Sequence, residues 1–145
     1  MVDNIRDRVA EDLLALLPFY HKNIIKMGHG ISGLQAAQYR VLGVLTRDGT
    51  LPMSEIGKRL YISKPYMTTL VDTLISARYV ERLPDSEDRR VIKIAITSLG
   101  KKHLKESSAI FKNNLNDLLS KLDEKDLIEL NISLEKLKRI LKKIS

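Results

Sequence analysis

The stretch LPDSEDRRVIKIAIT, residues 83–97, joins a charged loop to an apolar strand pattern. Residues 85–90 hold three acids and two arginines, and Lys93 and Ala95 then alternate with Ile92, Ile94 and Ile96. Alternation with period two predicts a strand with one buried and one solvated face. Because residues 79–83 also have strand composition, we expect a β-hairpin whose loop is residues 84–90.

Two short helical segments precede this hairpin. They are MSEIGKRL (53–60) and KPYMTTLVDTLISA (64–77), and only three residues, 61–63, separate them. Ser63 is a favoured N-cap residue, and Pro65 fits a first helical turn. Two helices joined so tightly predict a helix-turn-helix, and the hairpin that follows is its wing. Leu70, Val71, Leu74 and Ile75 form the expected core face of the second helix.

Further helices are expected on both sides of this module. Apolar residues at helical spacing predict a first helix that ends near the glycines of residues 28–33: Ile5, Val9, Leu13, Leu16, Tyr20 and Ile24. Ser32 and Gln35 have the spacing of a capping box. They open a second helix with apolar positions Leu34, Ala37, Val41, Leu42 and Leu45, which Asp48 and Gly49 close.

Two more helices are predicted after the wing. Thr97 caps a long helix with apolar positions Leu104, Phe111, Leu115, Leu118 and Leu122. Asp123 opens another, whose heptad-like seam is Leu127, Leu130, Leu134, Leu137, Leu141 and Ile144. The fold class is therefore mainly α with a small β-hairpin wing. One compact chain is expected, with an N-terminal dimerisation helix (1–32), a winged helix-turn-helix (33–97) and C-terminal dimerisation helices (98–145).

Composition narrows the classes of function. The 145 residues carry a formal net charge of +7, which suggests a polyanionic partner such as DNA, RNA or an anionic membrane surface. Cysteine is absent, which excludes disulfides, thiol catalysis and zinc-thiolate sites. No apolar run approaches the roughly 20 residues of a membrane span. The N-terminal segment is also too acidic for a signal peptide, so we expect a cytoplasmic protein. The lysine-rich residues 136–145 are compatible with a membrane-surface helix, but lysines beside a leucine seam are more often its solvated side, so no membrane partner is expected.

The chain resembles the MarR family of winged helix-turn-helix transcriptional regulators over nearly its whole length. The specific part is PDSEDRRVIKIAITSLGKK (84–102), which is similar to that family's wing pattern of an aspartate, any residue, an arginine, a strand, a threonine and a nearby glycine. Two positions depart from the family. Tyr61 stands in the turn and Arg78 follows the recognition helix, where members often have glycine.

The resemblance implies where DNA would be contacted. Arg90 is expected in the minor groove, where A·T-rich DNA has its strongest negative potential, and Asp88 is expected to hold the guanidinium from the same face of an extended strand. Arg89 reaches phosphate or stays in water, while Asp85 and Glu87 are turn formers. The expected reading surface of the recognition helix is Ser63, Lys64, Pro65, Tyr66, Thr68 and Thr69.

The resemblance also implies partners. We expect a homodimer on double-stranded DNA with an inverted-repeat operator, acting as a repressor and released by a small amphipathic, often phenolic, effector. Tyr20, His21, His29 and Tyr39 lie near the junction where such an effector would bind, but none is named as a site.

Two other classes of function were weighed. An enzyme is not expected, because the three histidines are scattered and no nucleophile elbow, phosphate loop or dinucleotide motif occurs. Neither a metal nor a cofactor is implied. The alternative is a winged helix that serves as a protein–protein adaptor without specific DNA binding, which salt dependence would distinguish.

Overall fold

The computed structural model describes residues 1–25 and 33–145. α1 (Val2–Tyr20) continues into a π-helical turn, η1 (His21–Ile25). The proposed capping box of Ser32 and the glycine-rich helix end both involve residues outside the described ranges. α2 (Gly33–Asp48) ends at Gly49, as predicted, with a φ of 84°.

A helix-turn-helix follows, formed by α3 (Met53–Leu60) and α4 (Lys64–Ser76). β2 (Val80–Pro84) and β3 (Ile92–Ile96) then pair antiparallel, with Val80 opposite Ile96 and Pro84 opposite Ile92. The predicted wing is confirmed. β1 (Leu51–Pro52), which was not predicted, pairs with the other edge of β3 and gives the sheet order β1-β3-β2. Two residues, one of them proline, carry no strand period that a sequence could reveal.

α5 (Ser98–Leu119) and α6 (Glu124–Leu141) complete the chain. The Thr97 side chain accepts a hydrogen bond from the Gly100 N–H (3.0 Å) and the Asp123 side chain accepts one from the Asp126 N–H (2.8 Å), so both predicted caps are confirmed. α5 ends three residues before Leu122, the last apolar position assigned to it, because the chain must become extended at the Asp123 cap.

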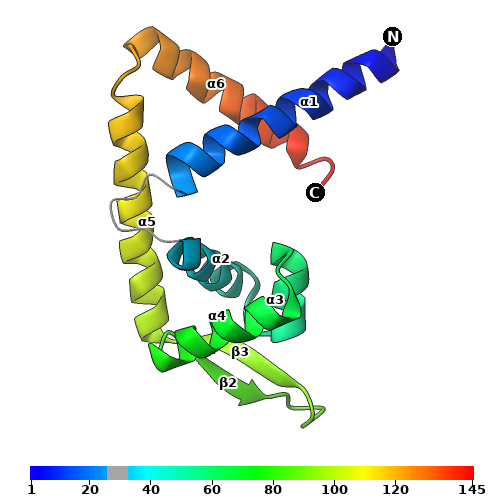
Figure 1. Ribbon diagram of the computed structural model, residues 1–145, viewed down its shortest axis with the longest axis vertical. Coiled ribbons are helices and arrows are strands. Elements are labelled where there is room, and N and C mark those ends of the chain that lie inside the picture. The colour runs from blue at the N-terminus through cyan, green and yellow to red at the C-terminus, as the bar shows by residue number, and fades with distance from the viewer. Residues whose placement is uncertain (26–32) are drawn as a thin grey trace.

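The core lies inside the winged module, between α2, α3, α4 and the sheet. Its fully buried large side chains include Leu42, Leu45, Ile56, Leu70, Leu74 and Ile94. α5 runs along the molecule from this module toward α1 and α6 at the opposite end (Figure 1). The module therefore has its own core, and α5 links it to the terminal helices.

The predicted alternation of β3 is wrong at two positions. Ile92 is 45% exposed and Ala95 only 8% exposed. Ile92 pairs with Pro84 at the outer end of the hairpin, beyond the core. Ala95 lies on the central strand opposite Glu81, and its side chain is a single methyl group that few neighbouring atoms suffice to bury.

Candidate nucleic-acid interface

The turn between α3 and α4 sets the start of the recognition helix. Tyr61 has φ 54° and ψ 43°, in the left-handed region, and the Ile62 N–H donates to the Gly57 carbonyl at 2.9 Å. This is a Schellman helix end. A Cβ on Gly57 would lie 3.1 Å from both the Ile62 carbonyl oxygen and Met67 Cγ, so the glycine lets α4 pack closely on α3.

α4 has one buried and one exposed side. Met67, Leu70, Val71 and Leu74 are buried, which confirms most of the predicted core face. The predicted reading surface lies on the exposed side: Ser63, Lys64, Pro65, Tyr66, Thr68 and Thr69. The Thr68 and Thr69 hydroxyls donate to the carbonyls of Lys64 and Pro65, four residues earlier, at 3.1 and 3.3 Å. These two side chains are therefore held against the helix.

Ser63 occupies the predicted N-cap position with extended backbone, but its side chain makes no capping hydrogen bond. An N-cap side chain usually accepts from the second or third amide of the helix. The second residue here is Pro65, which has no N–H, so one of the two usual donors is missing. The Ser63 hydroxyl is left exposed beside the first turn of α4.

The wing loop brings Asp88 and Arg90 together as predicted. Arg90 Nε donates to Asp88 Oδ1 at 3.2 Å and Arg90 Nη2 to Oδ2 at 3.4 Å, while the Arg90 side chain remains 91% exposed. The predicted geometry is wrong, however. Residues 88–91 form a turn, in which the Val91 N–H donates to the Asp88 carbonyl and the Arg90 N–H to Asp88 Oδ1, both at 3.0 Å. Asp88 therefore reaches Arg90 through an Asx-turn and not along one face of a strand.

Asp85 has a larger role than the expected turn former. Its Oδ1 pairs with Lys93 Nζ at 2.7 Å and its Oδ2 accepts the Asp88 N–H at 3.1 Å. The hydrogen bond from Lys93 and those from the loop amides hold the pKa of Asp85 below its usual value. Arg89 and Glu87 are exposed.

An ion pair joins the wing to the recognition helix. Arg82 Nη2 of β2 lies 2.7 Å from Asp72 Oδ1 of α4, and both side chains are about half exposed. The sequence offered no signal for this contact, since the two residues lie on different elements and have no motif spacing. The pair restrains the direction of the hairpin relative to α4.

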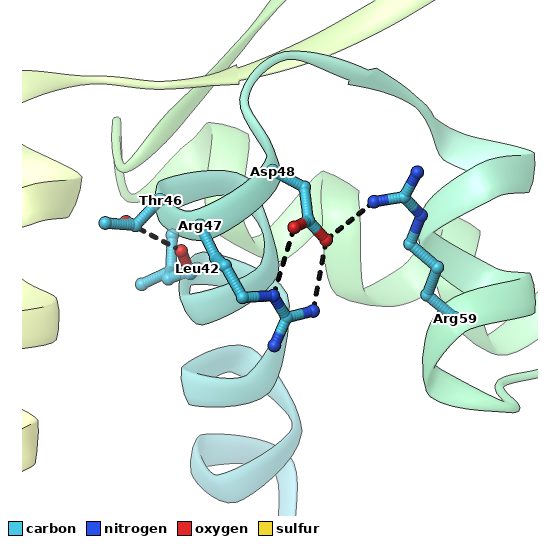
Figure 2. A network of polar contacts seen from close by, with 5 residues as sticks. All are labelled: Leu42, Thr46, Arg47, Asp48 and Arg59. Atoms are coloured by element: carbon cyan, nitrogen blue, oxygen red, sulfur yellow. Dashed lines mark hydrogen bonds and ion pairs between the residues drawn. The ribbon is translucent and has the colours of Figure 1, made fainter. Parts of the chain in front are cut away.

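A second ionic cluster joins α2 to α3. Asp48 at the end of α2 accepts from Arg47 Nε and Nη2 (3.0 Å each) and from Arg59 Nη1 of α3 (2.6 Å), as Figure 2 shows. The hydrogen bonds from Arg47 and Arg59 lower the pKa of Asp48. The cluster helps to position the first helix of the helix-turn-helix.

The end of α4 is tied to the start of α5. Arg78 has a φ of 63°, so the chain keeps the left-handed conformation expected at this position without glycine. Thr97 Oγ1 donates to the Arg78 carbonyl at 2.7 Å and lies 3.1 Å from the Tyr79 carbonyl oxygen. A Cβ on Gly100 would lie only 2.1 Å from that Tyr79 oxygen. The threonine and glycine of the sequence motif thus allow α5 to begin against the backbone of residues 78–79.

Comparison with known proteins agrees with this geometry. A sequence model of the MarR family matches residues 32–91. The chain is 30% identical over 107 residues to YpoP, an HTH-type transcriptional regulator of Bacillus subtilis, covering 63% of this chain and 76% of YpoP. It is 31% identical over 97 residues to the B. subtilis repressor MdtR, covering 67% of this chain and 63% of MdtR. The chain belongs to the MarR family.

Solved structures share the fold of this MarR-family protein. YusO of B. subtilis superimposes with a TM-score of 0.69 at 26% identity, covering 96% of this chain and 98% of YusO. Wild-type MarR of E. coli superimposes with a TM-score of 0.66 at 21% identity, covering 94% and 96%, and shows the shared fold. The module is thus the winged helix-turn-helix of a DNA-binding transcriptional regulator.

A cavity lies at the junction of this MarR-family fold, between the winged module and the terminal helices. It has a volume of about 420 Å³, and its lining includes Tyr20, Tyr39, Arg40 and Phe111. The Tyr39 hydroxyl shares a hydrogen bond with Ser108 Oγ (3.1 Å), and the centroid of the Tyr39 ring is 4.8 Å from that of Phe111. Tyr20 and Tyr39 therefore line one cavity, whereas His21 lines a separate hollow next to Leu17. His29 lies outside the described residues.

The remaining chemistry is sparse. Within residues 1–25 and 33–145, His, Asp and Glu side chains form no group suited to a metal ion. His103 stacks on Tyr79 with ring centroids 4.1 Å apart, which gives it a packing role. None of the helices described has the length and apolar character that crossing a bilayer demands.

Proposed function

We propose that this protein is a sequence-specific repressor that binds an inverted-repeat operator as a homodimer and releases it when a small amphipathic ligand binds. The observation that carries the proposal is the pairing of two exposed elements in one module. These are the polar first turns of α4 and a wing loop whose Arg90 is oriented by Asp88 but left open to a partner.

The first turns of α4 supply the major-groove contacts. Lys64 offers a cation for phosphate, and the exposed Ser63 hydroxyl and the start of the helix offer donors to phosphate oxygens. Tyr66, Thr68 and Thr69 reach base edges or backbone from the same exposed side. Because the threonine hydroxyls donate to the helix backbone, they meet DNA through their methyl groups or as acceptors.

The wing supplies the minor-groove contact. A narrow A·T-rich groove attracts arginine strongly. Arg90 has two nitrogens engaged by Asp88 and keeps its remaining donors for DNA. Arg89, also exposed, serves phosphate. Two of the three acidic residues of the loop, Asp85 and Asp88, hold the turn and the arginine, which explains why a DNA-binding loop carries them.

Dimerisation is proposed because the terminal helices leave their apolar faces uncovered. On α1, Ile5 is 48% and Val9 50% exposed; on α6, Leu130 is 36% and Leu134 47% exposed. Exposed apolar faces of this extent mark interaction surfaces. A second copy would cover them and would set two recognition helices roughly 34 Å apart, one turn of DNA.

The junction cavity is the proposed ligand site. Its aromatic lining and the nearby Arg40 suit a molecule with an aromatic body and an acidic or hydroxyl group. Filling the cavity through Ala36→Leu, on its α2 wall, should leave DNA affinity unchanged while abolishing release by substituted phenols. Release from the variant at the same phenol concentration as from the native protein would remove this site from the proposal.

The regulator proposal is tested by capture of sheared genomic DNA with excess nonspecific competitor at roughly physiological salt, followed by sequencing. Recovery of a few sites that share an inverted repeat, with affinity that falls steeply as salt rises, is expected. Because such a regulator must reach the DNA, this function also implies that the protein lies in the cytoplasm. Recovery of no site above background, with salt-insensitive binding to other proteins, would favour the adaptor function instead.

A further inference from the structure

Asp85 is the inner anchor of the wing loop. Its side chain is 15% exposed, compared with 42% for Asp88 and 91% for Arg90. The Asp85 N–H donates to the Val91 carbonyl at 3.0 Å, which closes the base of the loop. Lys93 of β3 holds one carboxylate oxygen at 2.7 Å, and this lysine is only 36% exposed. One oxygen of the carboxylate is thus fixed to a strand of the sheet, which leaves the other oxygen for the loop.

The contacts continue outward in a single series. Asp85 Oδ2 accepts the Asp88 N–H at 3.1 Å, and Asp88 Oδ1 accepts both the Arg90 N–H at 3.0 Å and Arg90 Nε at 3.2 Å. We call Lys93, Asp85, Asp88 and Arg90 the wing relay. It leads from a strand of the sheet to Arg90, an exposed cation of the loop.

The acidic residues of the wing relay are not explained by electrostatic attraction to DNA. An acid near DNA repels phosphate, so removal of any loop carboxylate should strengthen binding if charge alone mattered. The hydrogen bonds from Lys93 and the loop amides lower the pKa of Asp85, which favours its charged form. A charge kept in so unfavourable a place is best explained by the order that it imposes on the loop.

Ordering the loop before binding has a direct benefit. A free loop must lose backbone and side-chain freedom when its arginine enters a groove, and that entropic cost is subtracted from affinity. A loop already held by Asp85 avoids much of this loss.

We propose that Asp85 and Lys93 are positioning residues for Arg90, holding the wing turn in the conformation that presents the guanidinium to the minor groove of double-stranded DNA. This inference rests on the proposed function. Neither residue needs to touch DNA, since both act through Asp88.

The test compares Asp85→Ala with Glu87→Ala in the full chain. Both variants remove one negative charge from the same loop, and Glu87 is an exposed residue outside the wing relay. The probe is a duplex of about 30 base pairs, long enough for two half-sites. It carries the sequence most enriched from random DNA by the native protein. Glu87→Ala should bind equally or up to about twofold more tightly, since it removes one exposed repulsive charge. Asp85→Ala should bind DNA about fivefold more weakly, because the loss of roughly one net hydrogen bond lowers affinity by about that factor.

The same comparison in the Arg90→Ala background separates positioning from general damage. If Asp85 acts through Arg90, Asp85→Ala should cause no further loss there. Asp85→Asn, which keeps the side-chain size and an acceptor for the Asp88 N–H, should lose less affinity than Asp85→Ala. Unfolding midpoints of these variants should match the native protein, because the loop lies outside the core.

Each outcome decides between stated alternatives. Tighter binding by Asp85→Ala, as for Glu87→Ala, overturns the wing relay, and so does an equal loss with and without Arg90. If Arg90→Ala itself leaves affinity unchanged, the minor-groove role of the wing fails, and the wing relay with it. If the native protein enriches no sequence, the regulator proposal fails first.

Discussion

Replacing Gly100 by alanine should destabilise the protein strongly, because α5 begins in contact with backbone. The added Cβ would lie 2.1 Å from the Tyr79 carbonyl oxygen and 2.8 Å from Ile96 Cγ1, whereas ordinary contacts begin at 3.4 Å. Overpacking typically costs about 1–3 kcal/mol, and the obstacle here is backbone that cannot rotate away. Shifting α5 would also weaken the Thr97 hydrogen bond to Arg78, worth about 1 kcal/mol. We expect a loss of about 3–4 kcal/mol in the free energy of unfolding.

Gly43→Ala is the matched control, with the same chemical change inside α2. Apart from its chain neighbours and the adjacent backbone of its own helix, no heavy atom lies within 4 Å of its added Cβ. Alanine is favoured over glycine in a helix interior by about 1 kcal/mol, so this variant should be more stable than the native protein. The two substitutions should therefore shift stability in opposite directions.

Urea unfolding followed by circular dichroism, at one protein concentration because of dimerisation, measures both effects. In thermal unfolding followed by the same signal, Gly100→Ala should lower the midpoint by about 10 °C, because each kcal/mol corresponds to about 2–4 °C for a chain of this size. A Gly100→Ala variant within about 0.5 kcal/mol of the native protein, the usual range of harmless surface changes, would refute the close seating of α5 on residues 78–79.

Three further outcomes are expected. Tyr61→Gly and Arg78→Gly should each raise stability by about 0.5–1 kcal/mol in urea unfolding, since both residues are exposed and have positive φ; a loss would mean that their side chains stabilise the fold. The pKa of Asp48 is lower in the folded state, so its contribution to stability is complete above the ordinary pKa near 3.8 and is lost as the pH falls through the lowered pKa. Asp48→Asn should therefore flatten the acidic part of a plot of unfolding midpoint against pH. An unchanged profile would contradict the role of Asp48. Leu134→Glu, on the exposed seam of α6, should give a monomer by light scattering at micromolar concentration, and a retained dimer would place the interface elsewhere.

Local patterns in the sequence determined most of the elements. α3 has the predicted bounds, the caps at Thr97 and Asp123 form as expected, and Asp88 meets Arg90. These features depend on residues within a few positions of one another, so their hydrogen bonds form wherever the segment lies. The positions of Tyr61 and Arg78 were indicated by the resemblance to the family, whose members often have glycine there, and both residues have positive φ.

Contacts between elements were decided only by the tertiary structure. Arg82 meets Asp72, Arg59 meets Asp48, and Lys93 meets Asp85 because helices and strands are packed at particular positions, which no spacing along the chain encodes. Likewise, the leucine seam of α6 was visible in the sequence, but only the folded chain shows that it is left partly exposed. Periodicity specifies that a face is apolar, whereas the arrangement of the other elements determines whether the chain itself covers that face.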